Sequence, residues 1–331
     1  MSEFDAILFH MRDMHNIPLP NPKLRKPTQR YVMFLMESPS NDNFPYEKFG
    51  SYFNWTMTFR RDSDIYRPYG WVAPKNWEFH YAPKKSINWS QNATKQTDST
   101  TLPGVTHKVK KVAWLVSNCH THSQREHYVQ ELSKYIEVDI FGQCGQAKCP
   151  DNDRCMEFIQ SNYLFYLSFE NSICQDYITE KFWTPLSGNI LPIVLGGADY
   201  KSFAPPKSFI DANDYESPQK LAEQLNFLAS TPSAYSEYFD WKKYFKVYST
   251  TDEFLNRAMC QLCGKLNNPG EPVKSYNDIN QWWRSEAHCK TKGSYPWSKP
   301  EVPNPLSGFS SWLTKGASSI LETLRESKVI V

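Results

Sequence analysis

The stretch YLFYLSFENSICQDYITEKFW, residues 163–183, decides the fold class, because it predicts a buried strand that leads directly into a helix. Residues 163–169 have the length and the apolar, aromatic composition of a strand. Residues 177–188 predict a helix that ends at Gly188, and the apolar residues 190–196 predict the next strand. Hydrogen-bonding residues crowd the turn between strand and helix, so they either cap the helix or hold a ligand.

A second strand–helix–strand unit precedes this one in the chain. Residues 111–116 and 137–141 predict two strands, and residues 123–136 predict a helix between them. Ser123 and Glu126 have the spacing of a capping box at the start of that helix. Two such units predict an open α/β sheet, in which ligands bind at the carboxyl ends of the strands and helix amino termini favour anions.

The rest of the chain predicts further elements on both sides of these units. Additional strands are predicted at 4–9, 31–37 and 53–59, and additional helices at 217–229, 252–266 and 309–325. The polar, turn-rich stretch Pro74–Thr106 predicts a domain linker or a long surface loop.

Charge and motifs exclude several classes of ligand. The chain has 37 basic and 35 acidic residues and carries no nucleic-acid-binding signature, so we expect no nucleic-acid partner. Neither GxGxxG nor a P-loop is present, so a phosphate ligand depends on helix amino termini and on cations such as Arg125 and Lys181. No apolar run approaches the roughly 18 residues that span a bilayer, and the first residues do not resemble a signal peptide.

Cysteines and glycosylation sequons favour an oxidising lumen. The chain has eight cysteines, and Asn54, Asn88 and Asn92 each begin an acceptor sequon. A zinc site at Cys260 and Cys263, completed by His288 or Cys289, is the alternative.

Two acidic motifs are candidates for chemistry. Glu37 ends a predicted apolar strand, where partial desolvation raises a carboxylate pKa and suits a general base; the alternative is a strand-end glutamate that faces water. Asp62 and Asp64 form a DxD pattern of the kind that holds a divalent metal, unless Arg60, Arg61 and Arg67 pair with them instead.

The long motifs resemble one known family. Residues 37–70, 114–145, 169–183 and 191–210 closely resemble the α1,3-fucosyltransferases, glycosyltransferase family ten, and the resemblance extends from about residue 4 to residue 289. Residues 277–289 are most similar to the invertebrate and plant-type enzymes that fucosylate the N-glycan core.

The resemblance implies an α/β fold of GT-B type, in which two Rossmann-like domains face a cleft. Residues 1–106 are expected to form the acceptor-side domain, which looks incomplete at its amino terminus. Residues 107–289 are expected to bind GDP-fucose, and residues 290–331 form a Pro-rich tail with an amphipathic helix outside the resemblance. Family members reach the Golgi lumen through a membrane anchor, which is not visible in this chain.

The implied reaction is an inverting transfer of L-fucose from GDP-β-L-fucose to the 3-hydroxyl of GlcNAc on N-glycans of glycoproteins, without a metal or another cofactor. Lewis-type transfer to lactosamine antennae and a truncated homologue that only binds GDP-fucose stay open as alternatives. Glu37 matches the family's general base, and Asp62 and Asp64 are then expected to be structural. The expected donor-binding residues are Asn118, Arg125, Asn171, Ser172, Tyr177, Glu180 and Lys181. The resemblance also implies lumenal disulfides at Cys260 and Cys263, while Asp176 is expected to cap the helix partly.

Overall fold

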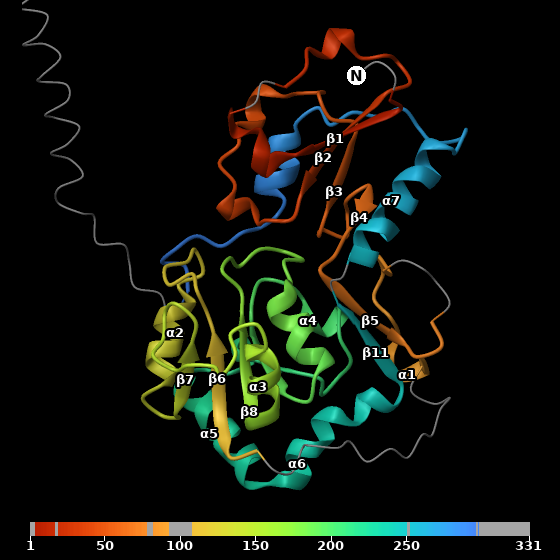
Figure 1. The fold of residues 1–331 in the computed structure, drawn as a ribbon. Helices are drawn as coiled ribbons and strands as arrows, with labels where there is room; N and C mark the ends of the chain where they lie inside the picture. Colours follow the sequence, from red (N-terminus) through yellow and green to blue (C-terminus); the bar gives the residue numbers. More distant parts are fainter. Residues whose placement is uncertain are drawn as a thin grey trace, which may run out of the picture. The chain divides into compact units, whose positions relative to one another are not determined.

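The computed structural model describes residues 4–16, 19–77, 82–92, 108–249, 252–295 and 297 of the chain (Figure 1). The chain divides into two compact units, Met1–Thr291 and Lys292–Val331, and both sheets belong to the first unit. The helix predicted at 309–325 lies outside the described residues.

The first sheet is parallel and has the strand order β1-β2-β3-β4. Its strands are β1 (Ala6–His10), β2 (Arg30–Leu35), β3 (Trp55–Thr58) and β4 (Ile65–Tyr66). The strands predicted at 4–9, 31–37 and 53–59 are therefore confirmed, with shifted ends. Because β2 stops at Leu35, Glu37 lies just beyond a strand end rather than inside the strand.

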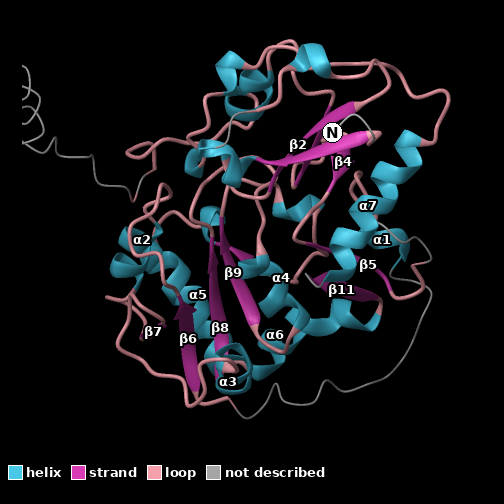
Figure 2. Cartoon of the chain, turned by 45° about the horizontal axis from the view of Figure 1, so that its top comes forward, coloured by secondary structure: helices cyan, strands magenta, loops and turns pink. Residues whose placement is uncertain are grey.

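The second sheet is also parallel and has the order β10-β9-β8-β6-β7 (Figure 2). Its strands are β6 (Lys110–Leu115), β7 (Val138–Phe141), β8 (Tyr163–Phe169), β9 (Leu191–Leu195) and β10 (Ile210–Asp211). β8 spans the seven residues predicted for it. Its side chains are almost all buried on both faces, and such a strand appears in the sequence as a continuous apolar run. Two parallel α/β sheets confirm the predicted fold class.

Helices cover both faces of the second sheet. The α-helices along the chain are α1 (Trp89–Asn92), α2 (Arg125–Leu132), α3 (Cys155–Asn162), α4 (Glu180–Ser187), α5 (Pro218–Ser230), α6 (Pro232–Ser236) and α7 (Asp252–Leu266). On one face, α3 packs against Tyr166 and α4 packs against Val194. On the other face Phe165 meets Tyr235 of α6 edge to face, and α5 contacts both α2 and α6.

Short helical turns connect these elements. The 3-10 helices are Met11–Asn16, Pro22–Leu24, Pro39–Asn41, Tyr46–Lys48, Tyr200–Ser202, Ala212–Asp214 and Glu237–Lys243, and a π-helical turn spans Gln281–Ser285.

Parts of the predicted linker lie among the described residues. Its first residue ends β5 (Gly70–Pro74), which pairs antiparallel with β11 (Phe245–Ser249). A Cβ on Gly70 would lie 2.5 Å from the ring of Trp183, so only glycine allows β5 to pass this close to α4. Ile87 and Trp89 pack against the core that surrounds α4.

The last part of the predicted second domain returns to the first sheet. On α7, Ala258 and Leu262 pack against Trp55 of β3. In the π-helical turn, Trp283 is fully buried and meets Phe59 edge to face, with ring centroids 5.9 Å apart. Residues 252–289 therefore cover the first sheet, although they follow the second sheet in sequence.

Six of the eight cysteines form disulfides, namely Cys119–Cys144, Cys149–Cys155 and Cys174–Cys289. Cys260 and Cys263 are free and exposed on α7, so the implied disulfides at these two positions are wrong for this structure. Cys289 is bonded to Cys174 and cannot complete a zinc site with them. The Cys174–Cys289 bond ties the turn after β8 to the segment that returns to the first sheet.

We expect the double substitution C174S/C289S to lower the free energy of unfolding by about 4–5 kcal/mol, because this disulfide closes a loop of 115 residues. The matched control C149S/C155S opens a loop of only 6 residues and should cost about 2 kcal/mol. Urea unfolding of both variants measures the difference. Equal losses would show that loop length does not govern the contribution of these bonds.

Two half-buried lysines bind backbone carbonyls just beyond the end of α4. Lys242 donates to the Gly188 carbonyl, and Lys108 donates to the Asn189 carbonyl. Burial lowers the pKa of Lys242 to about 8. Burial and the nearby Lys242 lower the pKa of Lys108 to about 8 as well.

We therefore expect stability to increase as the pH rises from about 8, the folded pKa of both lysines, to about 10.5, their ordinary value. A lysine with a depressed pKa binds fewer protons in the folded chain than in the unfolded chain, so its stabilising contribution is lost as the pH falls through the folded pKa. K242M should flatten the rise, as urea midpoints across this range would show. K220M is the control, because Lys220 is exposed and paired with Glu223. A slope that K242M leaves intact would contradict the assignment.

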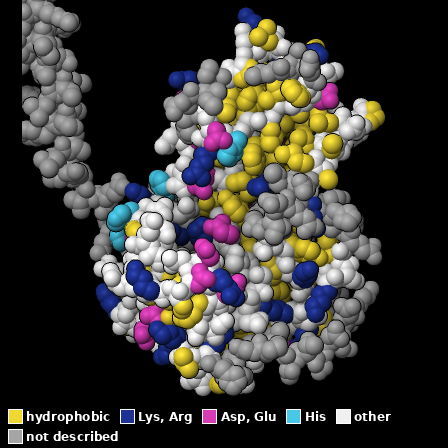
Figure 3. Space-filling view, in the orientation of Figure 1, with side chains coloured by type: hydrophobic (Ala, Val, Ile, Leu, Met, Phe, Trp, Pro, Cys, Tyr) yellow, Lys and Arg dark blue, Asp and Glu magenta, His cyan; other side chains and the backbone are white. Residues whose placement is uncertain are grey.

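Charges are mixed on the surface. On the face seen in Figure 3, Lys and Arg side chains stand among Asp and Glu, and hydrophobic side chains gather over the first sheet. Among the described residues, none of the helices combines the length and apolar character needed to cross a membrane.

Candidate functional site

The carboxyl ends of β6 and β8 lie where the second sheet reverses its strand order. From β6 the chain goes to β7 on one side and then to β8 on the other. Ligands of open α/β sheets bind in the crevice at such a switch point. Asn118 follows β6 and Asn171 follows β8, so two of the predicted donor-binding residues stand at this crevice.

Both asparagines share a cavity with Glu37. The cavity has a volume of about 210 Å³ and is lined from both sheets by Arg12, Leu35, Glu37, Asn41, Asp42, Asn118 and Asn171. The side-chain oxygen Oδ1 of Asn171 is buried and lacks a hydrogen-bond partner among the described residues. A buried acceptor without a partner on a cavity wall indicates a position where a ligand can donate.

Glu37 enters this cavity from the first sheet. It lies two residues beyond β2 and is half-buried. Asn41 Nδ2 donates to Glu37 Oε2 at 3.3 Å, and the Tyr69 hydroxyl donates to the carbonyl of Met36 at 2.7 Å. These bonds hold the turn that carries Glu37, and only one of them reaches its carboxylate. A loosely held carboxylate on a cavity wall can accept a proton from a ligand.

Glu170 is absent from the predicted site, yet it organises the start of α4. It follows β8 directly and is fully buried. Its Oε1 accepts the Thr179 N–H at 2.7 Å, and the Thr179 hydroxyl lies 3.0 Å from both carboxylate oxygens. Burial raises the pKa of Glu170, while Lys181 and the Thr179 donors oppose that rise. An acidic residue at the end of an apolar strand, the signal that selects Glu37, also selects Glu170.

Lys181 stands in the first turn of α4 with three polar neighbours. Its Nζ donates to Thr179 Oγ1 at 2.9 Å, and it lies 3.1 Å from Glu180 Oε1 and 3.6 Å from Glu170 Oε2. Burial alone would lower the pKa of Lys181, but Glu170 and Glu180 outweigh it and raise the pKa. The ammonium group is therefore charged at neutral pH and sits at a helix amino terminus, as an anion site requires.

Arg125 is more buried than a ligand-binding arginine usually is, with 3% of its surface exposed. It donates to the carbonyl of Phe169 at the end of β8 and to that of Asn118 at 3.4 Å. Its Nε is buried and has no partner within the described part of the chain. Arg125 thus joins the ends of β6 and β8 and keeps one donor available.

Tyr177 is mainly a core residue. It is 1% exposed, and its ring meets Phe59 edge to face at 5.0 Å between centroids. Burial raises the pKa of its hydroxyl, and the charges of the surrounding groups raise it further: Tyr69, Glu170, Glu37 and Glu180. The negative charges of Glu37, Glu170 and Glu180 therefore all act on this one hydroxyl group.

Ser172 and Glu180 have different environments from those expected of donor ligands. Ser172 is fully buried, and its hydroxyl accepts from Ser38 Oγ at 2.7 Å and from Asn41 Nδ2 at 3.4 Å. Ser172 joins the turn after β8 to the turn after β2. Because its hydroxyl is already used in these bonds, a direct contact with a bound nucleotide sugar does not fit this position. Glu180 is half-exposed as the first residue of α4 and pairs with Lys181.

Two predicted helix caps are wrong. Gln124 adopts a left-handed conformation, with φ of 52°, so α2 begins at Arg125. Ser123 then reaches the Glu170 carbonyl at 2.7 Å, and Glu126 accepts from Thr121 instead of Ser123.

At α4 the capping residue is Thr179 rather than Asp176. Asp176 has a φ of 58°, and its carboxylate accepts the Arg61 N–H at 3.0 Å. The left-handed turn points Asp176 back to the first sheet, which leaves the cap to Thr179.

The DxD aspartates are engaged in protein contacts. Asp62 pairs with Arg60 at 2.6 Å and accepts from the indole of Trp282 at 3.0 Å. Asp64 pairs with Lys274 at 2.6 Å and accepts from Tyr276 at 2.9 Å. Both carboxylates hold the returning carboxyl-terminal segment on the first sheet, which is a structural use.

The three sequons differ in accessibility. Asn54 is 5% exposed, and its Nδ2 donates to the Lys274 carbonyl at 2.8 Å. A glycan on this nitrogen is incompatible with the fold, so the prediction at Asn54 is wrong for this structure. Asn88 is exposed, and Asn92 ends α1 with a side chain outside the described part. Asn88 and Asn92 therefore stay predictions.

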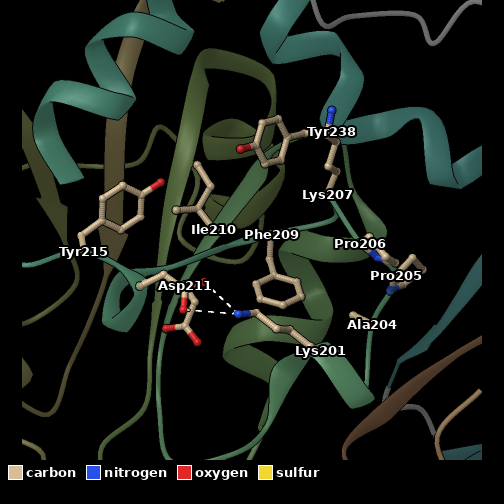
Figure 4. A pocket seen from close by; sticks show the side chains of 11 residues that line it. Lys201, Ala204, Pro205, Pro206, Lys207, Phe209, Ile210, Asp211, Tyr215 and Tyr238 are labelled. Atoms are coloured by element: carbon tan, nitrogen blue, oxygen red, sulfur yellow. Dashed lines mark hydrogen bonds and ion pairs between the residues drawn. The ribbon is translucent and has the colours of Figure 1, made fainter. Parts of the chain in front are cut away.

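Other cavities lie away from these residues. One of about 350 Å³ is flanked by Phe209, Tyr215 and Tyr238 at the edge of the second sheet (Figure 4). Another of about 510 Å³ adjoins it and is lined by Trp89 and Trp241. Neither cavity is lined by a predicted site residue.

Comparison with known families agrees with this geometry. Residues 105–282 match the family model described as glycosyltransferase family 10 (fucosyltransferase) C-term, and residues 1–70 match the model described as fucosyltransferase, N-terminal. The first match alone covers more than half of the chain. The chain therefore belongs to glycosyltransferase family 10, the fucosyltransferases.

Several individual fucosyltransferases are similar to this chain. Alpha-(1,3)-fucosyltransferase C of Drosophila melanogaster is 36% identical over 87% of this chain and 67% of its own length. Glycoprotein 3-alpha-L-fucosyltransferase A of the same organism is 41% identical over 72% of this chain and 44% of its own length. The chain thus spans between about half and two thirds of these relatives. A crystal structure of an alpha1,3-fucosyltransferase is similar at a TM-score of 0.47 and 16% identity, covering 81% of this chain and 79% of that one.

Proposed function

We propose that the chain transfers L-fucose from GDP-fucose to the 3-hydroxyl of GlcNAc on N-glycans of glycoproteins. The observation that carries the proposal is the cavity shared by Glu37 with Asn118 and Asn171, because it brings the first sheet's acid to the switch point of the second sheet. The likeness to an enzyme named glycoprotein 3-alpha-L-fucosyltransferase A supports the glycoprotein acceptor.

In the proposed reaction Glu37 is the general base. Its carboxylate takes the proton of the acceptor hydroxyl while that oxygen attacks the anomeric carbon of fucose. The bond between this carbon and the diphosphate oxygen breaks, and its electron pair leaves with GDP. One displacement from the opposite side inverts the anomeric configuration, which turns the β-linked donor into an α-linked product.

The second sheet is proposed to hold the donor. Lys181 and the free donor of Arg125 would stabilise the negative charge that grows on the leaving diphosphate, as oriented cations do in acyl and phosphoryl transfer. The buried oxygen of Asn171 would accept a hydrogen bond from the nucleotide. Glu180 is proposed to face the positive charge that develops on fucose, and Asn118 to border the nucleotide.

The two halves of the site are assigned to the two sheets. Residues 1–106 are proposed as the acceptor side and residues 107–289 as the donor side, with the returning part of the latter packed on the first sheet. The disulfides support a lumenal environment, since such bonds persist in oxidising compartments. We infer that this compartment is the Golgi lumen.

Purified chain incubated with labelled GDP-fucose tests the proposal. A glycopeptide with an exposed core GlcNAc should become fucosylated faster than a lactosamine glycopeptide, and product linkage should be α1,3 by NMR. EDTA should leave the rate unchanged, because Asp62 and Asp64 are held by Arg60 and Lys274. Preference for lactosamine would instead support the Lewis-type reaction. Binding of GDP-fucose without transfer to either acceptor would contradict the proposed activity.

A further inference from the structure

Glu170 is a buried acid that the proposed reaction does not use. It is fully buried at the end of β8, next to the crevice between β6 and β8. Burying a carboxylate without partners is unfavourable, so a fully buried glutamate needs compensating donors or cations. Glu170 has both kinds of partner. The donors belong to Thr179, and the cation is Lys181 of the proposed donor site.

The hydrogen-bond pattern fits an ionised carboxylate. The Thr179 N–H points at Oε1 from 2.7 Å, and the Thr179 hydroxyl is within 3.0 Å of both oxygens. The Lys181 ammonium lies 3.6 Å from Oε2. All of these neighbours are donors, which an ionised carboxylate accepts with either oxygen.

Thr179 relays this arrangement to Lys181. Its Oγ1 accepts from Lys181 Nζ at 2.9 Å and from the Lys181 N–H at 3.4 Å, while its own N–H is held by Glu170. The same residue is the amino-terminal cap of α4. The ammonium group is therefore fixed in the first turn of α4 by a chain of bonds that ends at Glu170.

Glu170 also acts on a second cation. Arg125 donates to the carbonyl of Phe169, the residue just before Glu170, and the negative charge of Glu170 opposes the lowering of the Arg125 pKa by burial. The backbone of Glu170 adds to the link, because its carbonyl accepts from Ser123 just before α2 and its N–H donates to Leu195 of β9. Glu170 thus stands between the loops that carry the two cations.

We propose that Glu170 is a positioning residue of the donor site, the shared counter-ion of Arg125 and Lys181 that, through Thr179, holds the Lys181 ammonium at the amino terminus of α4. The proposal rests on the proposed function for the identity of the ligand, a nucleoside diphosphate sugar. Glu170 does not touch the reacting atoms. It keeps two like charges side by side before the diphosphate arrives.

Several titratable groups surround this pair and bear on its titration. Those that act on Lys181 are Glu170, Glu180 and Arg125; those that act on Arg125 are Glu170, Glu126, Tyr166 and Tyr177; and Lys181 and Glu180 act on Glu170. Glu170 is the group common to both cations, so its neutralisation should affect both.

The test is E170Q, which keeps a carbonyl acceptor for the Thr179 N–H and removes the charge. Competitive acetylation of lysines, read by mass spectrometry across pH 7–11, gives the titration midpoint of Lys181 without needing activity. We expect that midpoint to fall by about one pH unit in E170Q, because the fully buried negative charge 3.6 Å from the ammonium is lost while Glu180 stays. Lys220 on α5 serves as the internal reference, and its midpoint should not move.

Binding and kinetics give the second measurement. The affinity for GDP should fall by about 10- to 100-fold in E170Q, since a charged hydrogen-bond network contributes that much. The alkaline limb of the pH–rate profile should move to lower pH. If Glu170 had only a structural role, E170Q would lower the folded fraction but leave the Lys181 midpoint and the pH–rate profile unchanged. An unchanged midpoint or an unchanged profile would therefore overturn the proposal. GDP affinity that is unchanged or higher would do the same.

If E170Q fails to fold, T179V replaces it. Valine removes the hydroxyl that links Glu170 to Lys181 and preserves the side-chain volume, and T179S restores the hydroxyl. The Lys181 midpoint should fall in T179V and recover in T179S; equal midpoints in the two variants would contradict the relay. Because the lysine readout uses no donor or acceptor, it can succeed even if fucosyl transfer is disproved.

Discussion

The substitution E37Q is expected to lower the rate of fucosyl transfer by about 10²- to 10⁴-fold, the usual contribution of a general base. Glutamine keeps the size of the side chain and the hydrogen bond from Asn41, but it cannot take the proton of the acceptor hydroxyl. The loss should appear in kcat, while the dissociation constant for GDP-fucose changes by less than about threefold. Single-turnover assays with saturating acceptor measure the chemical step.

The matched control is E47Q in the same loop region, where Glu47 is exposed and lines no cavity with the asparagines. Its transfer rate should equal that of the unmodified chain. If E37Q transfers fucose at an undiminished rate, Glu37 is not the base, and the strand-end glutamate that merely faces water becomes the correct interpretation.

The substitution K181M is expected to lower kcat/KM for GDP-fucose by about 10²- to 10³-fold, as the loss of an oriented group beside a developing negative charge does. Methionine retains most of the apolar stem, so the packing of α4 is preserved while the ammonium is lost. The affinity for GDP should fall in parallel, because the diphosphate is present in both ligands. Isothermal titration with GDP and initial rates at varied GDP-fucose concentration give the two values.

K220M controls for the loss of a lysine, since Lys220 pairs with Glu223 on the surface of α5. K181R separates charge from position: it keeps the positive charge but not the compact ammonium that Thr179 and Glu170 hold. Unchanged GDP affinity in K181M would place the diphosphate elsewhere.

Local pattern predicts the elements of the second sheet well. β8 coincides with its predicted range because almost all of its side chains are buried, which gives a continuous apolar run. α4 starts three residues later than predicted. Thr179 is held by Glu170, a tertiary contact, and this fixes the first helical residue at Glu180.

Long-range pairing is what sequence pattern does not reveal. The bond between Cys174 and Cys289 joins residues that are 115 positions apart, and connectivity among eight cysteines cannot be deduced from spacing. The return of α7 to the first sheet has the same character, since its apolar face would equally suit a helix on the second sheet.

The site shows the same division. Glu37 and Asn171 are predictable because each follows an apolar strand in a parallel sheet, and they meet at one cavity. The burial of Arg125 and the contact between Ser172 and Ser38 are not predictable, because they depend on how the turns of the two sheets meet. Family resemblance identifies such positions without describing their environment.

The return of α7 and Trp283 to the first sheet has a consequence for biosynthesis. The strands of that sheet leave the ribosome first, but α7, which packs on Trp55 of β3, begins only at Asp252, 186 positions after Tyr66. At roughly 5–20 residues per second, the ribosome needs about 10–40 s to synthesise the residues between the first sheet and α7. During this interval the face of the first sheet that α7 later covers is accessible to chaperones. The second sheet, which lies between the first sheet and α7 in sequence, can already fold.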